Sequence, residues 1–342
     1  MRGVAAALAL GATLAVTGAS AETRYSILPF GELQGWAEDN HAEALTAFME
    51  TCPDLDDPEW QALCALGQKE QDARAFFELF FRPVLIEDDA KPLFTGYFEP
   101  ELNGSLERTS RYRYPLYRKP PEVQQGGLWH SRSEIENGGL LDGRGLEIAW
   151  IDDPVDVFFL QIQGSGRVHL PDGGKIRVGY GGRNGHEYRS VGNELVRRGI
   201  YEPHQVSASV IRNWVRRNPE EGRELLQHNP SFIFFREVSA VPAANGPLGA
   251  MNRSITALRS IAVDPDYTPL GAPVWVEKLG AEPLQRLMIA QDTGSAIKGA
   301  QRADIFYGTG EEAGRTAGRV RDGGRMVVLL PIKKAFELAP EG

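Results

Sequence analysis

Three aspartates in the last third of the chain have neighbours that suit acid–base chemistry. Asp264 lies in SIAVDP, Asp292 in IAQDTGS and Asp304 in RADIFYG, each at or just beyond the end of an apolar, strand-like run. Strand ends in a small barrel converge on one rim, so the three carboxyl groups could meet there. Asp-Pro and Asp-Thr-Gly are also ordinary turn sequences, which leaves a purely structural role open for each of them.

Asp292 also begins a D-T-G-S sequence, which is the signature of pepsin-like proteases. Such a protease needs two aspartates that share one proton, and each aspartate comes from its own D-[TS]-G copy. The other Asp-Gly pairs that could supply the second copy, at Asp142, Asp172 and Asp322, lack the intervening Thr or Ser. The sequence therefore argues against an aspartic protease.

The other polar residues form no further recognisable catalytic motif. No two of the six histidines are spaced i, i+4, so a zinc site or a Ser-His-Asp triad has little support. Gly308–Gly314 is similar to a dinucleotide-binding loop, but no βαβ unit accompanies it. Gly164-Ser165-Gly166 lacks the spacing of a nucleophile elbow. Carboxyl groups remain as the candidate acid–base groups.

The N-terminal part of the chain is expected to be helical. Apolar residues recur at helical spacing between residues 41 and 86, and Pro53 and Pro58 separate the first helix from the next. Cys52 and Cys64 lie in this stretch, and an even pair of cysteines in an exported protein predicts a disulfide, here one that closes a local hairpin.

The elements that must position the aspartates are expected to be short strands. VDVFFLQIQGSGRVHL alternates in the manner of a strand and predicts a hairpin with KIRVGYGG across the turn at 171–174. Helices are expected at 187–198 and 207–217, and strands in LFTGYFEPEL, FIFFREV, SIAVD, PVWVEKL, RLMIAQD, ADIFYG and RMVVLLP. Such short strands between Gly and Pro turns favour a compact β-barrel, and residues 241–249 have the composition of a linker.

The first residues predict export from the cytoplasm. Arg2, the apolar run 4–16 and the small residues 19–21 are typical of a secretory signal peptide, with cleavage before Glu22. No cysteine follows it to carry a lipid, and no later run is long enough to span a membrane. The net charge of −9 argues against a nucleic-acid partner. We expect a soluble periplasmic protein of a Gram-negative bacterium, most simply a monomer.

Two runs around the aspartates resemble the three-aspartate domain of MltA-type lytic murein transglycosylases: GPLGAMNRSITALRSIAVDPDYTPLGAPVWV and LMIAQDTGSAIKGAQRADIFYGTGEEAG. Upstream, LFTGYFEPEL, YPLYRKP, FFLQIQGSGRV, RVGYGGRNGHEYRSVG and NPSFIFFRE follow in the order of that family. The resemblance extends from Leu93 to Pro331 and is loose over the N-terminal helices.

The resemblance implies a mainly β fold with accessory helices. A double-psi β-barrel carries an inserted, β-rich second domain, and a groove lies between them. On this basis we expect a signal peptide at 1–21, helices and the first part of the barrel at 22–102, the inserted domain at 103–245 and the rest of the barrel at 246–342.

The resemblance also implies a reaction. Such an enzyme is a peptidoglycan lytic exotransglycosylase, a carbon–oxygen lyase that cleaves the β-1,4 bond between N-acetylmuramic acid and N-acetylglucosamine and leaves a 1,6-anhydromuramoyl end. Its partners are glycan strands, with other cell-wall enzymes as further candidates, and it needs neither cofactor nor metal. One carboxyl group suffices as acid and base, because the attacking group is the C6 hydroxyl of the sugar itself.

By the family pattern, the acid/base is Asp304, and Asp292 and Asp264 support it. The pKa of Asp304 must be raised for it to start protonated, and burial beside Ile305 and Phe306 and the charge of Asp292 are the expected causes. Nine further residues are expected to bind the glycan: Thr95, Tyr97, Glu99, Gln161, Gln163, Ser165, Tyr180, Asn184 and Lys298.

Strand alternation narrows the list of expected glycan contacts, and two alternative functions remain open. Tyr97 and Phe98 should point to opposite faces of their strand, with Glu99 on the side of Tyr97, where it could rival Asp304 as the acid. A glycan-binding module of expansin type would bind the same polymer without turnover. A true hydrolase would use Asp304 with a second carboxylate. Product analysis separates the three.

Overall fold

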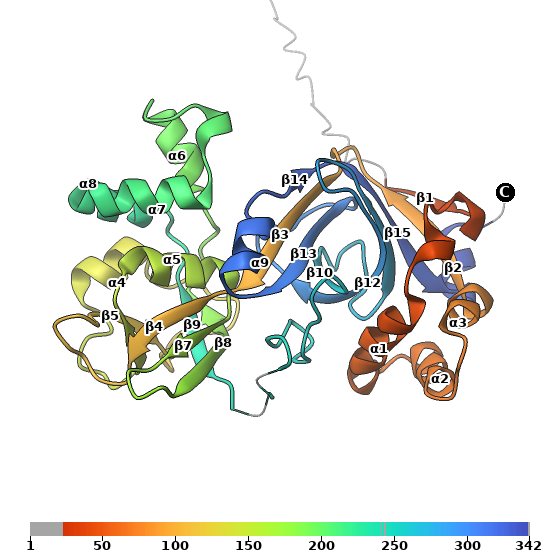
Figure 1. The fold of residues 1–342 in the computed structure, drawn as a ribbon, viewed down its shortest axis with the longest axis horizontal. Coiled ribbons are helices and arrows are strands. Elements are labelled where there is room, and N and C mark those ends of the chain that lie inside the picture. Colours follow the sequence, from red (N-terminus) through yellow and green to blue (C-terminus); the bar gives the residue numbers. More distant parts are fainter. Residues whose placement is uncertain (1–22, 240, 243, 341–342) are drawn as a thin grey trace, which may run out of the picture.

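The computed structural model describes residues 23–239, 241–242 and 244–340. The signal peptide expected at 1–21 lies outside these residues. Within them the chain forms two β-sheets with helices around each, and Figure 1 shows the two sheets beside one another. No helix in this part of the chain has the length and apolar character needed to cross a membrane.

The first sheet has nine strands in the order β1-β2-β15-β11-β12-β10-β13-β3-β14 and curls into a barrel-like body. Its strands are β1 (Arg24–Ile27), β2 (Phe81–Glu87), β3 (Leu93–Glu99), β10 (Ser260–Val263), β11 (Pro273–Lys278), β12 (Leu284–Thr293), β13 (Arg302–Thr309), β14 (Arg321–Asp322) and β15 (Gly324–Pro331).

The second sheet has six strands in the order β5-β6-β4-β7-β8-β9, and all of them lie in the sequence between β3 and β10. They are β4 (Glu101–Ser105), β5 (Tyr114–Tyr117), β6 (Glu147–Ile151), β7 (Gly166–His169), β8 (Lys175–Arg183) and β9 (Ile233–Glu237). The chain therefore leaves the first sheet after β3, builds the second sheet and returns, which is the inserted arrangement that we expected. The change of sheet falls at Pro100, just before the expected boundary at 102.

The helices divide between the two sheets. Those at the ends of the chain are α1 (His41–Thr51), α2 (Pro58–Gly67), α3 (Ala73–Phe80), α9 (Gly310–Ala317) and α10 (Ile332–Leu338). Those of the inserted region are α4 (Arg132–Gly138), α5 (Pro154–Gln163), α6 (Val191–Arg197), α7 (Ala208–Arg217) and α8 (Pro219–Gln227). Short 3₁₀ turns lie at Phe30–Glu32, Trp36–Glu38, Cys52–Asp54 and Pro203–Gln205.

Each sheet has its own core. The largest apolar cluster joins the N-terminal helices to the first sheet, and its rings Phe48, Phe76, Phe77 and Phe81 lie in mutual contact. Three smaller clusters lie wholly within residues 102–235. No member of the large cluster is shared with the smaller ones, as expected for two separately packed bodies.

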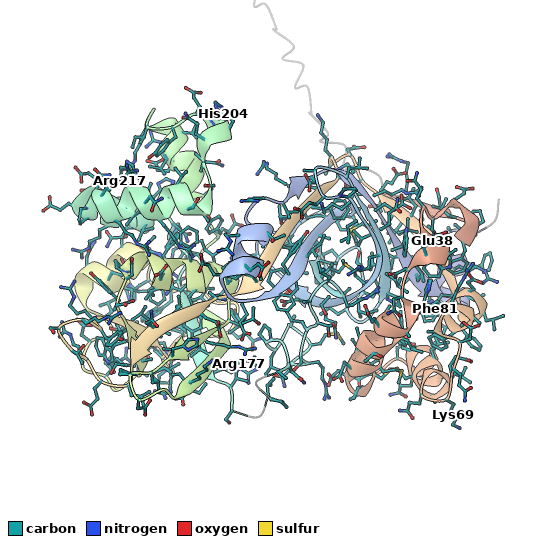
Figure 2. All side chains as sticks on the ribbon, in the orientation of Figure 1. Glu38, Lys69, Phe81, Arg177, His204 and Arg217 are labelled. Atoms are coloured by element: carbon teal, nitrogen blue, oxygen red, sulfur yellow. A yellow bond between two sulfur atoms is a disulfide. The ribbon has the colours of Figure 1, made fainter. Side chains whose placement is uncertain are left out.

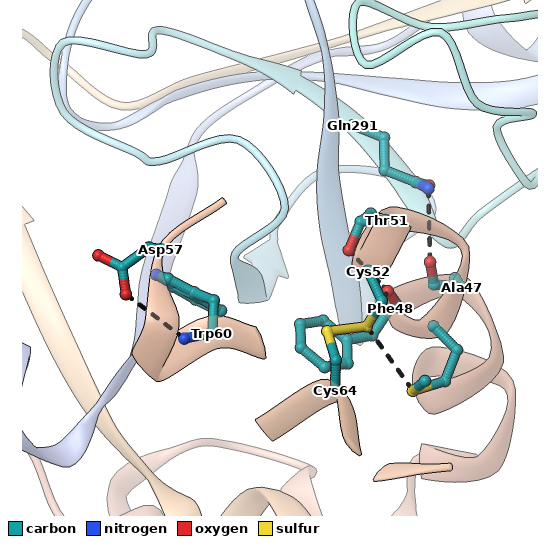
Figure 3. Close-up of a disulfide and its surroundings, with 9 residues drawn as sticks. Ala47, Phe48, Thr51, Cys52, Asp57, Trp60, Cys64 and Gln291 are labelled. Carbon is teal, nitrogen blue, oxygen red and sulfur yellow. Dashed lines mark hydrogen bonds between the residues drawn. A yellow bond between two sulfur atoms is a disulfide. The ribbon is translucent and has the colours of Figure 1, made fainter. Parts of the chain in front are cut away.

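The expected disulfide is present between Cys52 and Cys64, 12 residues apart. It joins the end of α1 to α2, as Figure 3 shows, and Cys64 is buried in the core of the first sheet. Nearby, the amide of Gln291 in β12 donates to the carbonyl of Ala47 in α1 at 3.4 Å, which ties the helix to the barrel.

Two expectations about secondary structure are wrong. Residues 154–163 form α5, not a strand: Asp153 accepts a hydrogen bond from the N–H of Val155, Pro154 begins the helix, and Gly164 ends it with a φ of 79°. A continuous apolar run fits either element, and here the end signals decide. Residues 81–87 form β2, not a helix, because they pair with both β1 and β15. The expected hairpin across the turn at 171–174 is confirmed, but its first strand is only β7, the last part of the run that we expected to be extended.

Candidate active site

Asp304 lies on β13 of the first sheet, between β10 and β3. β13 and β3 are parallel, and Asp304 is opposite Thr95. The Thr95 hydroxyl donates to Asp304 Oδ1 at 2.5 Å, and Arg302 Nη2 donates to Thr95 Oγ1 at 2.8 Å. No described residue donates a hydrogen bond to the other carboxyl oxygen, Oδ2. This oxygen is therefore the one that can exchange a proton with a bound molecule.

Burial raises the pKa of Asp304, against the opposing effects of the Thr95 hydrogen bond and the Arg302 charge. The neighbours Ile305 and Phe306 are almost fully buried, as the apolar explanation requires. The charge of Asp292 is not among the causes, so that part of the expected explanation is not needed. The result is a carboxyl group that favours its protonated form more than an exposed aspartate does.

Asp292 lies on the same row of the sheet as Asp304, with one strand between them. Ala262 of β10 pairs with both aspartates, so the two side chains share a face. Tyr97 donates its hydroxyl to Asp292 Oδ2 at 2.9 Å, and the N–H groups of Ala250 and Thr293 donate to Oδ1 at 3.0 and 2.9 Å. Burial raises the pKa of Asp292 to about 6, and the charge of Asp304 adds to the rise, although the three hydrogen bonds oppose it.

Asp264 does not join this pair. Its carboxylate accepts hydrogen bonds from Lys298 Nζ at 2.9 Å and from the N–H of Gly299 at 3.0 Å. Burial opposes its ionisation, but these hydrogen bonds outweigh burial and lower the pKa of Asp264. The structure therefore brings together two of the three aspartates, whereas Asp264, at the end of β10, binds the loop that precedes β13.

The alternation expected along β3 is confirmed. Tyr97 points toward Asp292, whereas Phe98 lies against α9, where a methyl group added to Gly314 would come within 2.7 Å of the Phe98 ring. Glu99 is on the side of Tyr97 but is completely buried. It pairs with Arg167 and Arg177 of the second sheet and accepts a hydrogen bond from Thr309. Such a carboxylate has no access to a sugar, which argues against Glu99 both as a glycan contact and as the acid.

Two family models match the chain. The MltA specific insert domain covers residues 93–236, and the 3D domain covers residues 259–330. Membrane-bound lytic murein transglycosylase A of Vibrio cholerae is 35% identical over 73% of this chain and 69% of its own length. The chain belongs to this MltA family.

Solved structures of the MltA family have the same fold. The membrane-bound lytic murein transglycosylase from Agrobacterium tumefaciens is 33% identical, with a TM-score of 0.82 over 92% of this chain and 99% of that one. The structure of E. coli MltA with bound chitohexaose is 30% identical, with a TM-score of 0.73 over 90% of this chain and 94% of that one. Both match across the two sheets, so the inserted arrangement is that of the MltA family.

Two other residues that we expected to bind glycan are engaged inside the inserted region of this MltA-family chain. Gln161 is buried on α5 and accepts a hydrogen bond from buried Arg132. Asn184 is completely buried, donates to the carbonyls of His130 and Pro230, and accepts from the N–H of Phe232. Burial and these contacts hold both side chains inside the protein, which argues against either as a glycan contact.

The other expected contacts remain reachable to different degrees. Gln163 accepts a hydrogen bond from the N–H of Phe98 at 3.0 Å, which places it at the junction of α5 with β3. Ser165 is nearly buried, whereas the Tyr180 side chain is 52% exposed. Lys298 is exposed but is paired with Asp264. Tyr180 is thus the aromatic candidate of this group, with an exposed ring that could stack on a sugar.

Sequence reasoning missed Arg302, the residue that holds Thr95. It is two positions before Asp304 on one strand, so alternation places the two side chains on the same face. That spacing was a signal in the sequence, but the partner is not, since Thr95 lies 207 residues away. The N–H of Ala250, which binds Asp292, gave no sequence signal at all.

Proposed function

We propose that this protein cleaves the β-1,4 bond between N-acetylmuramic acid and N-acetylglucosamine in peptidoglycan, with Asp304 as the only acid and base. The observation that carries the proposal is the state of Asp304. Its pKa is raised, one oxygen is fixed by Thr95, and the other has no partner among the described residues. A glycosidase acid requires this combination of a raised pKa and a free oxygen.

The proposed reaction has two proton transfers and one displacement. Protonated Asp304 gives its proton to the glycosidic oxygen, and the bond from that oxygen to C1 of the muramic acid breaks. The C6 hydroxyl oxygen of the same sugar forms a new bond to C1, and the Asp304 carboxylate takes the hydroxyl proton. The products are a new 4-hydroxyl end and a 1,6-anhydro ring. Asp304 is protonated again, and no water is consumed.

Asp292 is proposed to act from one strand away. Its pKa of about 6 leaves it mostly ionised at neutral pH, Tyr97 donates a hydrogen bond to one of its oxygens, and it shares a face of the sheet with Asp304. A carboxylate at this position stabilises the positive charge that develops at C1 when the glycosidic bond breaks. Burial and the adjacent carboxylate keep the Tyr97 pKa well above its ordinary value, so Tyr97 remains a neutral donor to Asp292.

The substrate assignment rests on the family and on the arrangement of the two sheets. A relative in this family has been solved with bound chitohexaose, a β-1,4-linked sugar chain. We propose that the glycan lies across the junction of the two sheets, where β3 and α5 meet and Gln163 contacts Phe98. A location in the periplasm agrees with a cell-wall substrate and with the signal peptide expected at 1–21.

Digestion of purified sacculi tests the proposal. Soluble products from the wild-type protein should carry anhydro ends, which mass spectrometry distinguishes from hydrolysed ends by the mass of one water. Hydrolysed ends would instead support a two-carboxylate hydrolase, and binding without soluble products would support a glycan-binding module.

The Asp304→Asn variant tests the assignment of the acid. We expect product release to fall by about a thousandfold, in the range by which general acid–base groups act. Asp89→Asn is the matched control, because Asp89 is an exposed carboxyl of the same domain. Near wild-type turnover by Asp304→Asn, with the control unchanged, would refute the assignment.

A further inference from the structure

Glu99 is the centre of a buried charge cluster that the catalytic mechanism does not use. Its side chain is completely buried at the end of β3. Oε2 accepts hydrogen bonds from Arg167 Nε at 2.8 Å and from the Thr309 hydroxyl at 2.8 Å. Arg177 Nη2 also donates to Oε2 at 3.4 Å, whereas Arg177 Nε lies 2.9 Å from Oε1 in an ion pair without hydrogen-bond geometry.

The cluster joins parts of the chain that are otherwise separate. Glu99 and Thr309 belong to β3 and β13 of the first sheet, whereas Arg167 and Arg177 belong to β7 and β8 of the second. Both arginines also donate to the carbonyl of Asn245, in the segment that returns the chain to the first sheet. Figure 2 shows Arg177 extending from the second sheet toward that returning segment.

The energetics of such a cluster make it specific for one geometry. Removing charged groups from water is costly, and the cost is offset only when each group is paired and hydrogen-bonded at good distances. One carboxylate faces two guanidinium groups here. Each guanidinium also donates an N–H group to the carbonyl of Asn245. A shift of one sheet against the other would break several of these contacts together.

The cluster also lies at the ends of the strands that carry the acid. Glu99 ends the strand that carries Thr95 and Tyr97, and Thr309 ends the strand that carries Asp304. We propose that Glu99, Arg167 and Arg177 form an interdomain lock. It fixes the second sheet relative to β3 and β13, and so sets where a glycan held by the second sheet meets Asp304. Glu99 is then a positioning residue, not an acid, and only the kinetic part of its test rests on the proposed function.

The Glu99→Gln variant separates a lock from an acid. We expect KM for long glycan strands to rise about tenfold, with kcat within about threefold of the wild type, because the chemistry is intact and the alignment is not. Amide hydrogen exchange should accelerate in β7, β8 and residues 244–249, and stay unchanged in β11 and β12. Glu101→Gln is the matched control, since Glu101 is a half-exposed carboxylate that pairs with His169 within the second sheet. It should change neither readout.

Two results would overturn the lock. One is unchanged exchange together with unchanged KM. The other is a collapse of kcat like that of Asp304→Asn with exchange unchanged, which would make Glu99 an acid. If Glu99→Gln does not accumulate as folded protein, Arg177→Lys keeps the charge but loses the paired contacts, and must show the same exchange pattern. Hydrogen exchange needs no substrate, so it tests the lock even if the proposed function fails.

Discussion

At the scale of single residues, Asp304 is placed between opposing influences. Burial raises its pKa, while the Thr95 hydroxyl and the Arg302 guanidinium favour the carboxylate. An acid that must also act as a base benefits from this balance, because the proton has to leave in one step and return in the next. Of these groups, the Thr95 hydroxyl can be removed by substitution without changing the charge of the site.

The Thr95→Val variant should therefore shift the pH dependence of the reaction. Loss of the donated hydrogen bond raises the pKa of Asp304 further, so the protonated acid persists to higher pH. We expect the basic limb of the kcat/KM profile to move up by about half to one pH unit, and the maximum to fall about tenfold because the carboxyl group is less well oriented. The measurement is initial rate against pH on soluble glycan strands.

Thr46→Val is the control for this variant. Thr46 is exposed on α1, and its hydroxyl bonds only to the carbonyl of Ala42, so the same substitution there should leave the profile unchanged. A basic limb that stays in place or moves to lower pH in Thr95→Val would contradict the assigned role of the hydrogen bond.

Asp292 gives a stability prediction whose sign follows from its pKa of about 6. An ordinary aspartate ionises near pH 4, so the folded protein holds this proton more tightly than the unfolded chain does. The resulting stability is fully present below pH 4 and is lost as the pH rises through 6. The loss by pH 7 should be roughly 2 to 3 kcal/mol.

Urea unfolding of the wild type and of Asp292→Asn between pH 4 and pH 7 measures this effect. The asparagine does not titrate, so the difference between the two free energies of unfolding isolates Asp292. The wild type should lose stability relative to the variant as the pH rises. A constant difference would show that the pKa of Asp292 is the same in the folded and unfolded protein, and a change in the opposite direction would show that folding lowers it. Either result would contradict the raised pKa.

At the scale of elements, β3 does most of the positioning. In seven residues it supplies the hydroxyl that holds Asp304, the hydroxyl that holds Asp292 and the carboxylate of the lock. Its opposite face is covered by α9, which packs so closely that Gly96 has no room for a side chain. A methyl group there would come within 2.8 Å of the Ala317 backbone and 2.9 Å of the Tyr307 ring.

The Gly96→Ala variant should separate α9 from β3. Overpacking of this kind costs about 1 to 3 kcal/mol, and the backbone cannot move aside as a flexible side chain would. Since Gly96 lies between Thr95 and Tyr97, we expect activity to fall about tenfold or more together with thermal stability. Gly323→Ala is the control, because a methyl group at Gly323 meets no atom within 4 Å. Wild-type stability of Gly96→Ala would contradict this account.

At the scale of the whole molecule, the N-terminal segment is held to the barrel by a buried ion pair. Arg259 and Asp39 are both nearly inaccessible and form two hydrogen bonds of 2.8 and 3.0 Å. Asp39 also accepts from the N–H of Leu287, and Arg259 donates to the Leu287 carbonyl. The pair therefore joins the start of α1 to the central strand β12, on the side of the barrel away from the second sheet (Figure 1).

Breaking this pair should be costly, whereas an exposed pair nearby should not matter. We expect Arg259→Met to lose about 3 to 5 kcal/mol of unfolding free energy, because it leaves Asp39 buried without its partner. Arg259→Met with Asp39→Asn should lose clearly less than the two single losses added together. Arg253→Met removes the exposed pair with Asp54 and should cost below about 1 kcal/mol. Equal losses for Arg259→Met and Arg253→Met would contradict the argument.

The sequence by itself determined the order and type of most elements and the identity of the acid candidate. Five of the six C-terminal strands contain the short apolar runs between turns, and Asp304 lies in a sequence motif that resembles the MltA family. The sequence did not determine the type of element where an apolar pattern fits both a helix and a strand. Residues 154–163 became a helix through their Asp-Pro start and Gly end, and residues 81–87 became a strand through pairing with β1 and β15.

The tertiary structure alone decided which polar groups meet. Thr95 and Asp304 are 209 residues apart and share a hydrogen bond because β3 and β13 pair directly. Tyr97 and Asp292 are 195 residues apart and share one because β10 and β13 bring β12 into the same sheet as β3. The same fold buried Glu99 between two arginines and Asn184 among carbonyl groups, although both had suitable chemistry for a sugar. Residue type fixes what a side chain can do, whereas burial and long-range pairing fix which of those capacities is left for a substrate.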